Sequence, residues 1–141
     1  APHAERSFFE ALAPRAAAQI ELIHPVLIVY MLWTFVKSEV VVPGFFHVAG
    51  DHLMRNLEQL DRCGLGTAPW CFAKAREPHA ELFHLVSREV LRRECLAEAS
   101  LARGEAPRPQ DCLAPRGVQN LFWAYARLGK GADEAARPCI E

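Results

Sequence analysis

The chain has 141 residues and a formal net charge of −1, and 51% of its residues are apolar. This length suits one domain with a sizeable core, so the composition excludes a disordered tail and a flexible linker. A protein that binds nucleic acid over its whole surface is usually strongly basic, and any positive surface here must therefore be confined to one stripe. The longest apolar run, residues 25–33, is shorter than a bilayer span requires, and we expect no membrane span.

The sequence lacks the residue patterns of common catalytic and metal sites. Its five cysteines include no C-x-x-C pair, which argues against a zinc ribbon and favours free, buried thiols. No Ser-His-Asp or Cys-His order can be argued, no glycine-rich phosphate loop is present, and the six histidines do not form an H-E-x-x-H pattern. We expect a protein that is not an enzyme and has no catalytic residues, metal, cofactor or small-molecule substrate.

Aromatic and basic residues recur at a spacing of 37 residues, which we call the 37-residue register. Trp33 and Trp70 have this spacing, and so do Phe35 and Phe72. The remaining pairs are Lys37 and Lys74, Phe46 and Phe83, His47 and His84, Phe8 and Phe45, Phe9 and Phe46, and Ile20 and Leu57. So many coincidences in one register predict copies of a single structural unit.

In chain order, helices are predicted at residues 7–23, 25–38, 44–60, 65–75, 79–101 and 116–128. The first, third and fifth carry the repeated phenylalanines on an amphipathic stripe, and the others carry the tryptophans. Proline and glycine punctuate the boundaries, with Pro25 near one helix start, Pro43 and Pro78 in turns, and Gly129 just after the last helix.

An insertion interrupts the register before the last tryptophan. Trp123 follows Trp70 by 53 residues, which is 16 more than the spacing of the other copies. Residues 102–115 contain three prolines and a glycine and therefore predict an exposed loop. Without this loop, Trp123, Tyr125 and Arg127 fall on the tryptophan, aromatic and basic positions of the earlier units.

These patterns predict an all-α fold, an α-solenoid of stacked antiparallel helix pairs with a period of 37 residues. We expect a single helical-repeat domain over residues 1–141, with a first helix at 7–23, units at 25–60 and 65–101, a loop at 102–115 and a partial unit at 116–141. Trp33 and Phe35 project about 200° apart on an α-helix, so both faces of such a helix should be covered. Neither end carries a clear polar cap, which suggests more chain or a partner there.

Two segments resemble the octotricopeptide-repeat family, which is akin to the repeats of FASTK and RAP-domain proteins. They are SFFEALAPRAA (7–17) and GVQNLFWAYARLG (117–129). The family's tryptophan helix places an Asn and an apolar residue before Trp-Ala-aromatic/Leu-Ala-basic-Leu-Gly, as found from Asn120 to Gly129. The first two units match loosely, since Tyr30 and Thr67 replace the Asn and no Leu-Gly follows Lys37 or Lys74.

The resemblance implies work on RNA inside a mitochondrion or a plastid, with the mitochondrion favoured. Because the repeat run is short, it implies a structural subunit of an organellar ribosome or another ribonucleoprotein. Ribosomal RNA and neighbouring protein subunits would then be the partners. The alternative is a protein-only scaffold, an accessory subunit of a large organellar complex without RNA contact, and the near-neutral charge favours it.

The 37-residue register places polar and basic residues on one surface, and we predict that this surface binds RNA. Tyr30, Thr67 and Asn120 precede the tryptophans by three residues, and basic residues follow them by four. Seven residues make almost two helical turns, so these positions share one side of their helix. The candidate nucleic-acid-binding residues are Lys37, Lys74, Arg127, Asn120, Arg116 and Lys130.

Both basic clusters also have purely structural interpretations. A basic residue in the last turn of a helix is stabilised by the helix macrodipole without a ligand. Arg88, Arg92 and Arg93 are interleaved with glutamates, which predicts ion pairs on a solvated face. The tryptophans are expected to pack between helices rather than to stack on bases.

Overall fold

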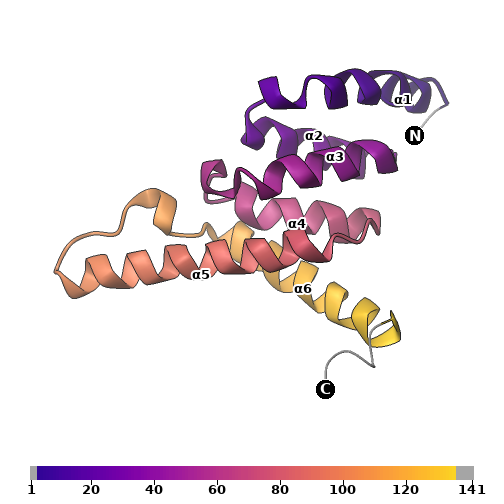
Figure 1. Cartoon of the computed structure of the whole chain (residues 1–141). Helices are drawn as coiled ribbons and strands as arrows, with labels where there is room; N and C mark the ends of the chain where they lie inside the picture. Colours follow the sequence, from indigo (N-terminus) through magenta and orange to yellow (C-terminus); the bar gives the residue numbers. More distant parts are fainter. Residues whose placement is uncertain (1–2, 136–141) are drawn as a thin grey trace.

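The structure is a computed structural model that describes the backbone of residues 3–135 and the side chains of residues 5–127 (Figure 1). Its helices, in order, are α1 (His3–Ala18), η1 (Ile20–Leu22), α2 (Pro25–Lys37), α3 (Pro43–Met54), η2 (Leu57–Gln59), α4 (Gly64–Ala75), α5 (Ala80–Ala102), η3 (Pro109–Asp111) and α6 (Pro115–Ala135). The described residues contain no strand, and the predicted all-helical class is confirmed. No helix in this range is both long and apolar enough to cross a bilayer.

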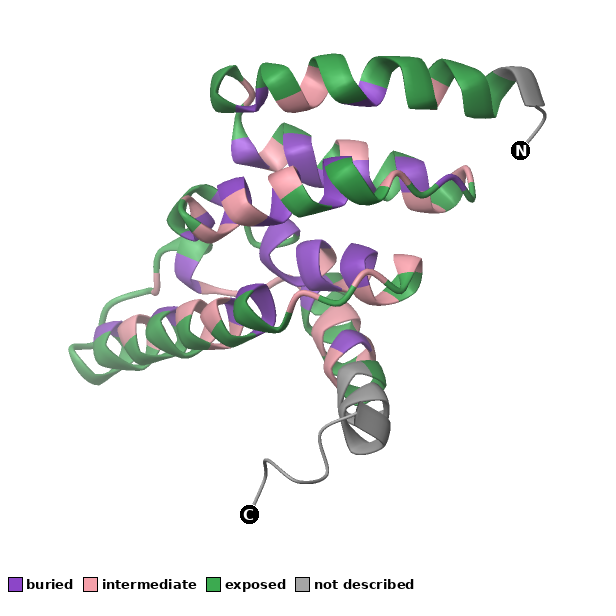
Figure 2. Cartoon of the chain, turned by 45° about the vertical axis from the view of Figure 1, so that its right-hand side comes forward, coloured by how far each residue is buried: buried purple, intermediate pink, exposed green. Residues whose placement is uncertain are grey.

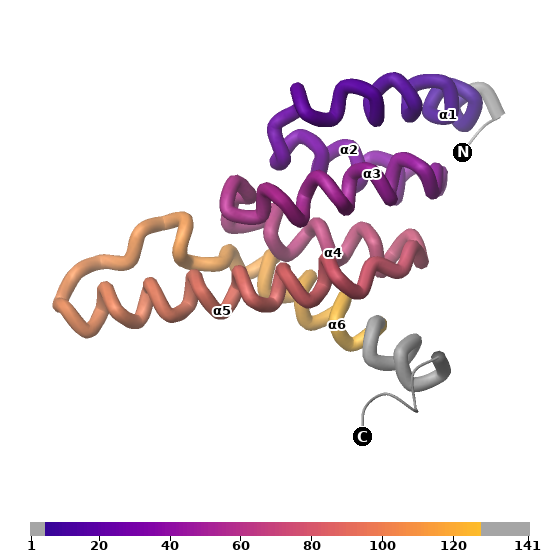
Figure 3. Tube along the Cα trace, in the orientation of Figure 1, coloured from indigo at the N-terminus to yellow at the C-terminus, as the bar shows by residue number. Residues whose placement is uncertain are grey.

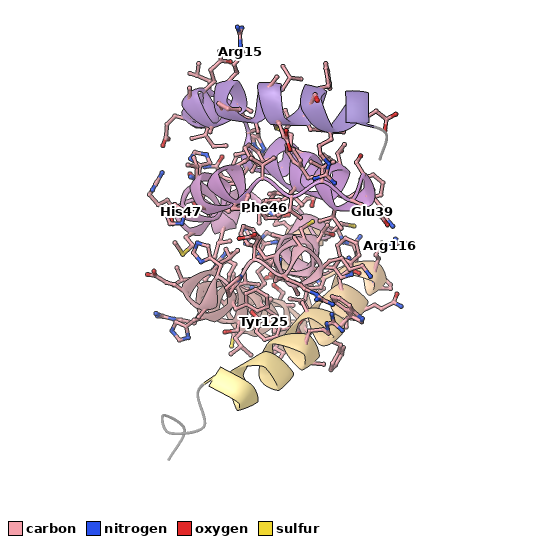
Figure 4. The ribbon with its side chains drawn as sticks, turned by 90° about the vertical axis from the view of Figure 1, so that its right-hand side faces the viewer. Arg15, Glu39, Phe46, His47, Arg116 and Tyr125 are labelled. Atoms are coloured by element: carbon pink, nitrogen blue, oxygen red, sulfur yellow. The ribbon has the colours of Figure 1, made fainter. Side chains whose placement is uncertain are left out.

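The six α-helices pack in two layers. Helix α3 contacts α1 and α5, and α4 contacts α2 and α6, so odd-numbered helices form one layer and even-numbered helices the other. Seen from the side, His47 of α3 and Arg116 of α6 lie on opposite sides of the molecule, and Phe46 lies between them (Figure 4). The most extensive contact joins α4 and α6.

Aromatic side chains join the two layers. Phe46 is fully buried at the centre, and buried residues are concentrated in α2, α3 and α4 (Figure 2). Each odd-numbered helix contacts the following even-numbered helix through one aromatic pair at a similar distance. The ring centroids are 5.3 Å apart for Phe9 and Phe35, 5.4 Å for Phe46 and Phe72, and 5.1 Å for Phe83 and Tyr125.

Two tryptophan-bearing helices end in the same way. Glu39 follows α2 with φ 55°, and Arg76 follows α4 with φ 57°, so both adopt the left-handed conformation. The next amide in each case donates to a carbonyl five residues back, from Val40 to Phe35 and from Glu77 to Phe72. These bonds satisfy carbonyls that the helix end would otherwise leave open.

The predicted helices at 7–23 and 44–60 are each interrupted. Helix α1 ends at Ala18 and α3 at Met54, and a short 3-10 helix follows each. The interruption turns Ile20 and Leu57 into the core, where they are 6% and 5% exposed.

Gly129 was expected to end the last helix, but α6 continues to Ala135, so that prediction is wrong. A glycine within a helix costs only about 1 kcal/mol and does not by itself stop it.

Helix α5 and the segment after it project beyond the other helices (Figure 3). Arg93, only 2% exposed, anchors this region to the body. Its guanidinium donates to the carbonyls of Leu57 at 3.2 Å, Leu60 at 2.8 Å and Gln110 at 3.2 Å. One side chain thereby connects α5 with η2 and with the loop around η3.

Helices α4 and α6 approach each other through two glycines. A Cβ atom on Gly66 would overlap the carbonyl group of Gly117. A Cβ atom on Gly117 would lie 2.8 Å from the carbonyl oxygen of Arg62. Only glycine permits this close contact between the two backbones.

The cysteines differ in exposure. Cys71 is buried, and burial raises its pKa to about 12. Cys63 and Cys95 are exposed, so the expectation of buried thiols is wrong for these two. Cys139 lies outside the described residues.

Candidate nucleic-acid interface

The three tryptophans lie along the layer formed by α2, α4 and α6, and cations lie over their rings. Lys37 Nζ is 5.5 Å from the centroid of Trp33 and 5.7 Å from that of Trp70. One lysine therefore contacts tryptophans of two successive helices in this layer. At such distances the ring quadrupole attracts a cation.

The same arrangement continues on α6. The rings of Trp70 and Trp123 are 6.3 Å apart. Lys74 Nζ lies 5.3 Å and Arg127 Cζ 5.1 Å from the centroid of Trp123. We call the row formed by Trp33, Lys37, Trp70, Lys74, Trp123 and Arg127 the tryptophan–cation stripe.

A groove of about 260 Å³ lies beside this stripe. Its aromatic and polar lining includes Tyr30, Trp33 and Lys37 from α2, Asp61 and Cys63 just before α4, Thr67 and Trp70 from α4, and Arg116 and Asn120 from α6. Asn120 Nδ2 donates to Thr67 Oγ1 at 3.3 Å, so two positions that precede a tryptophan by three residues are in contact. The groove therefore offers aromatic rings, hydrogen-bonding groups and two cations on one surface.

The cations of this surface are not neutralised. Lys37, Lys74, Arg116 and Arg127 are exposed, and none has a carboxylate within 4.0 Å among the side chains of residues 5–127. Asp61 is the acidic residue of the groove lining. Its Oδ1 accepts from the amide of Gly64 at 2.5 Å, which holds the carboxylate at the start of α4.

The basic cluster of α5 has the opposite character. Glu89 accepts from Arg92 at 2.6 Å and from Arg93 at 3.0 Å, and the hydrogen bond from Arg92 is the main cause that lowers the pKa of Glu89. The predicted ion pairs are confirmed for Arg92 and Arg93, but no carboxylate lies within 4.0 Å of Arg88 among the described side chains. Arg93 is buried and not on a solvated face, because its guanidinium contacts the loop around η3.

Most of the predicted nucleic-acid-binding residues lie together. Lys37, Arg116 and Asn120 line the groove, and Lys74 and Arg127 belong to the stripe. The side chain of Lys130 lies outside the described residues. Trp33 is 42% exposed, so the expectation that both faces of its helix are covered is wrong there.

The sequence reasoning missed two features, one in the groove and one on the other side of the molecule (Figure 4). Asp61 and Cys63 line the groove because they immediately precede α4, a placement that no spacing rule predicts. His47 and His79 both approach Asp51, with nitrogen–oxygen distances of 3.4 and 3.5 Å. The i,i+4 spacing of His47 and Asp51 is the signal that could have indicated this cluster.

The histidine cluster does not make a metal centre. Among the described residues, no group of three or more His, Cys, Asp or Glu side chains is placed to hold a metal ion.

Comparison with protein-family models, with curated proteins and with solved structures finds no match to this chain.

Proposed function

We propose that this chain is a non-catalytic helical-repeat protein that binds single-stranded RNA along the tryptophan–cation stripe. In this proposal it serves as a structural subunit of an organellar ribosome or another ribonucleoprotein. The observation that carries the RNA contact is the alternation of tryptophans with exposed cations along α2, α4 and α6. The organelle, a mitochondrion in preference to a plastid, and ribosomal RNA as the ligand rest on the octotricopeptide-repeat resemblance.

The proposal takes the two layers as an α-solenoid with the 37-residue register. The three similar aromatic pairs between the layers support it, because their members occupy equivalent positions of the register. The left-handed residues Glu39 and Arg76, and the 3-10 helices that begin at Ile20 and Leu57, are also 37 residues apart and support it independently.

The chemistry of the stripe suits a single strand better than a duplex. Unpaired bases stack on aromatic side chains, and backbone phosphates bind Lys and Arg. Tyr30 is 60% and Trp33 is 42% exposed beside Lys37, so rings and charge are accessible together. The side chains of Thr67 and Asn120 add hydrogen-bonding groups for base edges.

Charge reversal tests the RNA contact. The triple variant K37E/K74E/R127E should lose affinity for a fluorescent single-stranded RNA in an anisotropy titration. The slope of log affinity against log salt is negative, and its magnitude should decrease by about 2, because each lost phosphate contact removes roughly 0.7. The matched control R6E/R15E/R88E changes the net charge equally and should keep most of the affinity, because these residues lie on α1 and α5.

Equal losses in the two triple variants would contradict the proposal, because only overall charge would then matter. Absence of RNA affinity in the unmodified chain would also contradict it and leave the protein-only scaffold. Circular dichroism of both variants establishes that they are folded. A second triple variant with glutamine in place of the three cations removes charge without adding repulsion, and it should also lose affinity.

A thiol in the groove gives an independent readout. Cys63 lines the groove and Cys95 lies on α5, and both are exposed. RNA bound at the stripe should slow alkylation of Cys63 and leave the rate at Cys95 unchanged, as measured by mass spectrometry of the peptides. Equal protection of both thiols, or of neither at saturating RNA, would contradict binding in the groove.

A further inference from the structure

The first and last helices carry large apolar side chains on the surface. On α1, Phe8 is 60% and Leu12 is 44% exposed. On α6, Phe122 is 76% and Val118 is 36% exposed. In each pair the two residues are four apart and therefore lie on one face of their helix. These two faces, which we call the α1 end face and the α6 end face, occur at opposite ends of the layers (Figure 1).

The residues equivalent to the α1 end face are buried in the inner helices. Phe8 corresponds in the 37-residue register to Phe45 and Leu82, which are 2% and 0% exposed. Leu12 corresponds to Ala49 and Val86, both 0% exposed. Phe45 is covered by the preceding even-numbered helix, since its ring centroid lies 5.1 Å from that of Phe35 on α2. Helix α1 has the same face, and no helix among residues 3–135 covers it.

The residues equivalent to the α6 end face are also buried in the inner helices. Phe122 corresponds to Leu32 and Pro69, and Val118 corresponds to Ile28 and Leu65, once the insertion is allowed for. All four of these equivalents are fully buried. They lie on α2 and α4, and each of these helices has a following helix packed against it, α3 and α5 respectively. Helix α6 has no such neighbour among the described residues.

We infer that a second copy of this chain covers these faces, stacked head to tail so that α6 of one copy lies against α1 of the next. The equivalents of the α1 end face are covered by an even-numbered helix, which the described part of the chain does not supply to α1, and α6 is an even-numbered helix. The equivalents of the α6 end face lie on helices that contact a following odd-numbered helix, which residues 3–135 do not supply to α6, and α1 is an odd-numbered helix. The two end faces are therefore complementary to each other and not to themselves.

This inference rests on the proposed repeat but not on RNA binding. A head-to-tail contact uses two different surfaces, so it leaves one of each kind free and propagates as a chain of copies or closes as a ring. Stacking of this kind would also continue the tryptophan–cation stripe from one copy to the next. Exposed apolar patches at both ends, without polar caps, are what such propagation requires.

Sedimentation velocity without RNA tests the inference. The unmodified chain should show a sedimentation coefficient that rises with protein concentration. Phe8→Glu and Phe122→Glu should each make the chain monomeric, because each destroys one half of every contact. A one-to-one mixture of the two variants should form a heterodimer, since the intact α6 end face of one meets the intact α1 end face of the other.

The control is Leu101→Glu, near the end of α5 that projects from the body, where Leu101 is 62% exposed. It should associate like the unmodified chain. A monomeric unmodified chain at all concentrations would overturn the inference. So would association that only one of the two end variants abolishes, because that result indicates a symmetric contact. RNA titrations at concentrations where the chain is monomeric keep the two proposals separable.

Discussion

The basic residues of α5 and those of the stripe have different neighbours. Arg92 and Arg93 lie against the carboxylate of Glu89, whereas Lys37 and Lys74 lie over tryptophan rings. In the first group the charge is satisfied within the molecule and holds the loop around η3 in place. In the second group the charge is exposed to solvent. A chain with a net charge of −1 can therefore still have a local positive surface. Substitutions in the two groups should change the stability of the chain by different amounts.

Replacement of Arg93 should have the largest effect on stability. Arg93→Met keeps most of the side-chain volume but removes the donor to the carbonyls of Leu57, Leu60 and Gln110, while Glu89 keeps its hydrogen bonds from Arg92. We expect a loss of about 2–3 kcal/mol in the free energy of unfolding, because a buried acceptor that loses its donor costs about 1–3 kcal/mol. Urea denaturation measures this loss. A loss below about 1 kcal/mol would remove the contrast between the two groups.

Acid should weaken the α5 cluster by a smaller amount. The hydrogen bond from Arg92 lowers the pKa of Glu89 below its usual 4.5 in the folded chain. A lowered folded pKa gives stability that is fully present above the unfolded pKa and is lost as the pH falls through the folded value. Below pH 4.5, the unmodified chain should therefore lose stability more steeply than Glu89→Gln. Parallel pH profiles for the two proteins would show that Glu89 does not contribute.

Substitution in the stripe should have the smallest effect on stability. Lys37→Gln removes two exposed cation–π contacts and a favourable charge in the last turn of α2. We expect a loss of about 1 kcal/mol or less, since exposed contacts of this kind contribute roughly 0.5–1 kcal/mol. The same urea denaturation measures it. A loss comparable to that of Arg93→Met would mean that the stripe is a structural element, and the proposed RNA contact would lose its basis.

Much of the even-numbered layer was predictable from spacing. Seven residues separate Tyr30 from Lys37, and this spacing predicts that both lie on one side of α2, as the groove lining confirms. Trp33, with Lys37 four residues later, likewise predicts their contact. Such predictions succeed because they depend only on the geometry of a single helix.

Features that depend on distant segments were not predictable. The spacing of Glu89 and Arg93 predicts their ion pair, but not that Leu57, Leu60 and Gln110 would supply carbonyls to a buried guanidinium. The breaks after Ala18 and Met54 depend on the core that receives Ile20 and Leu57. Periodicity describes which face of a helix is apolar, but it does not describe what covers that face.

The glycine crossing of α4 and α6 determines where the molecule can adjust when it binds a partner. Gly66 and Gly117 bring two backbones together, and backbones cannot repack as side chains do. At the position of α2 that corresponds to Gly66 stands Val29, whose side chain prevents the direct backbone contact that the two glycines make between α4 and α6. We therefore expect the interval between Trp70 and Trp123 to change less on binding than the interval between Trp33 and Trp70.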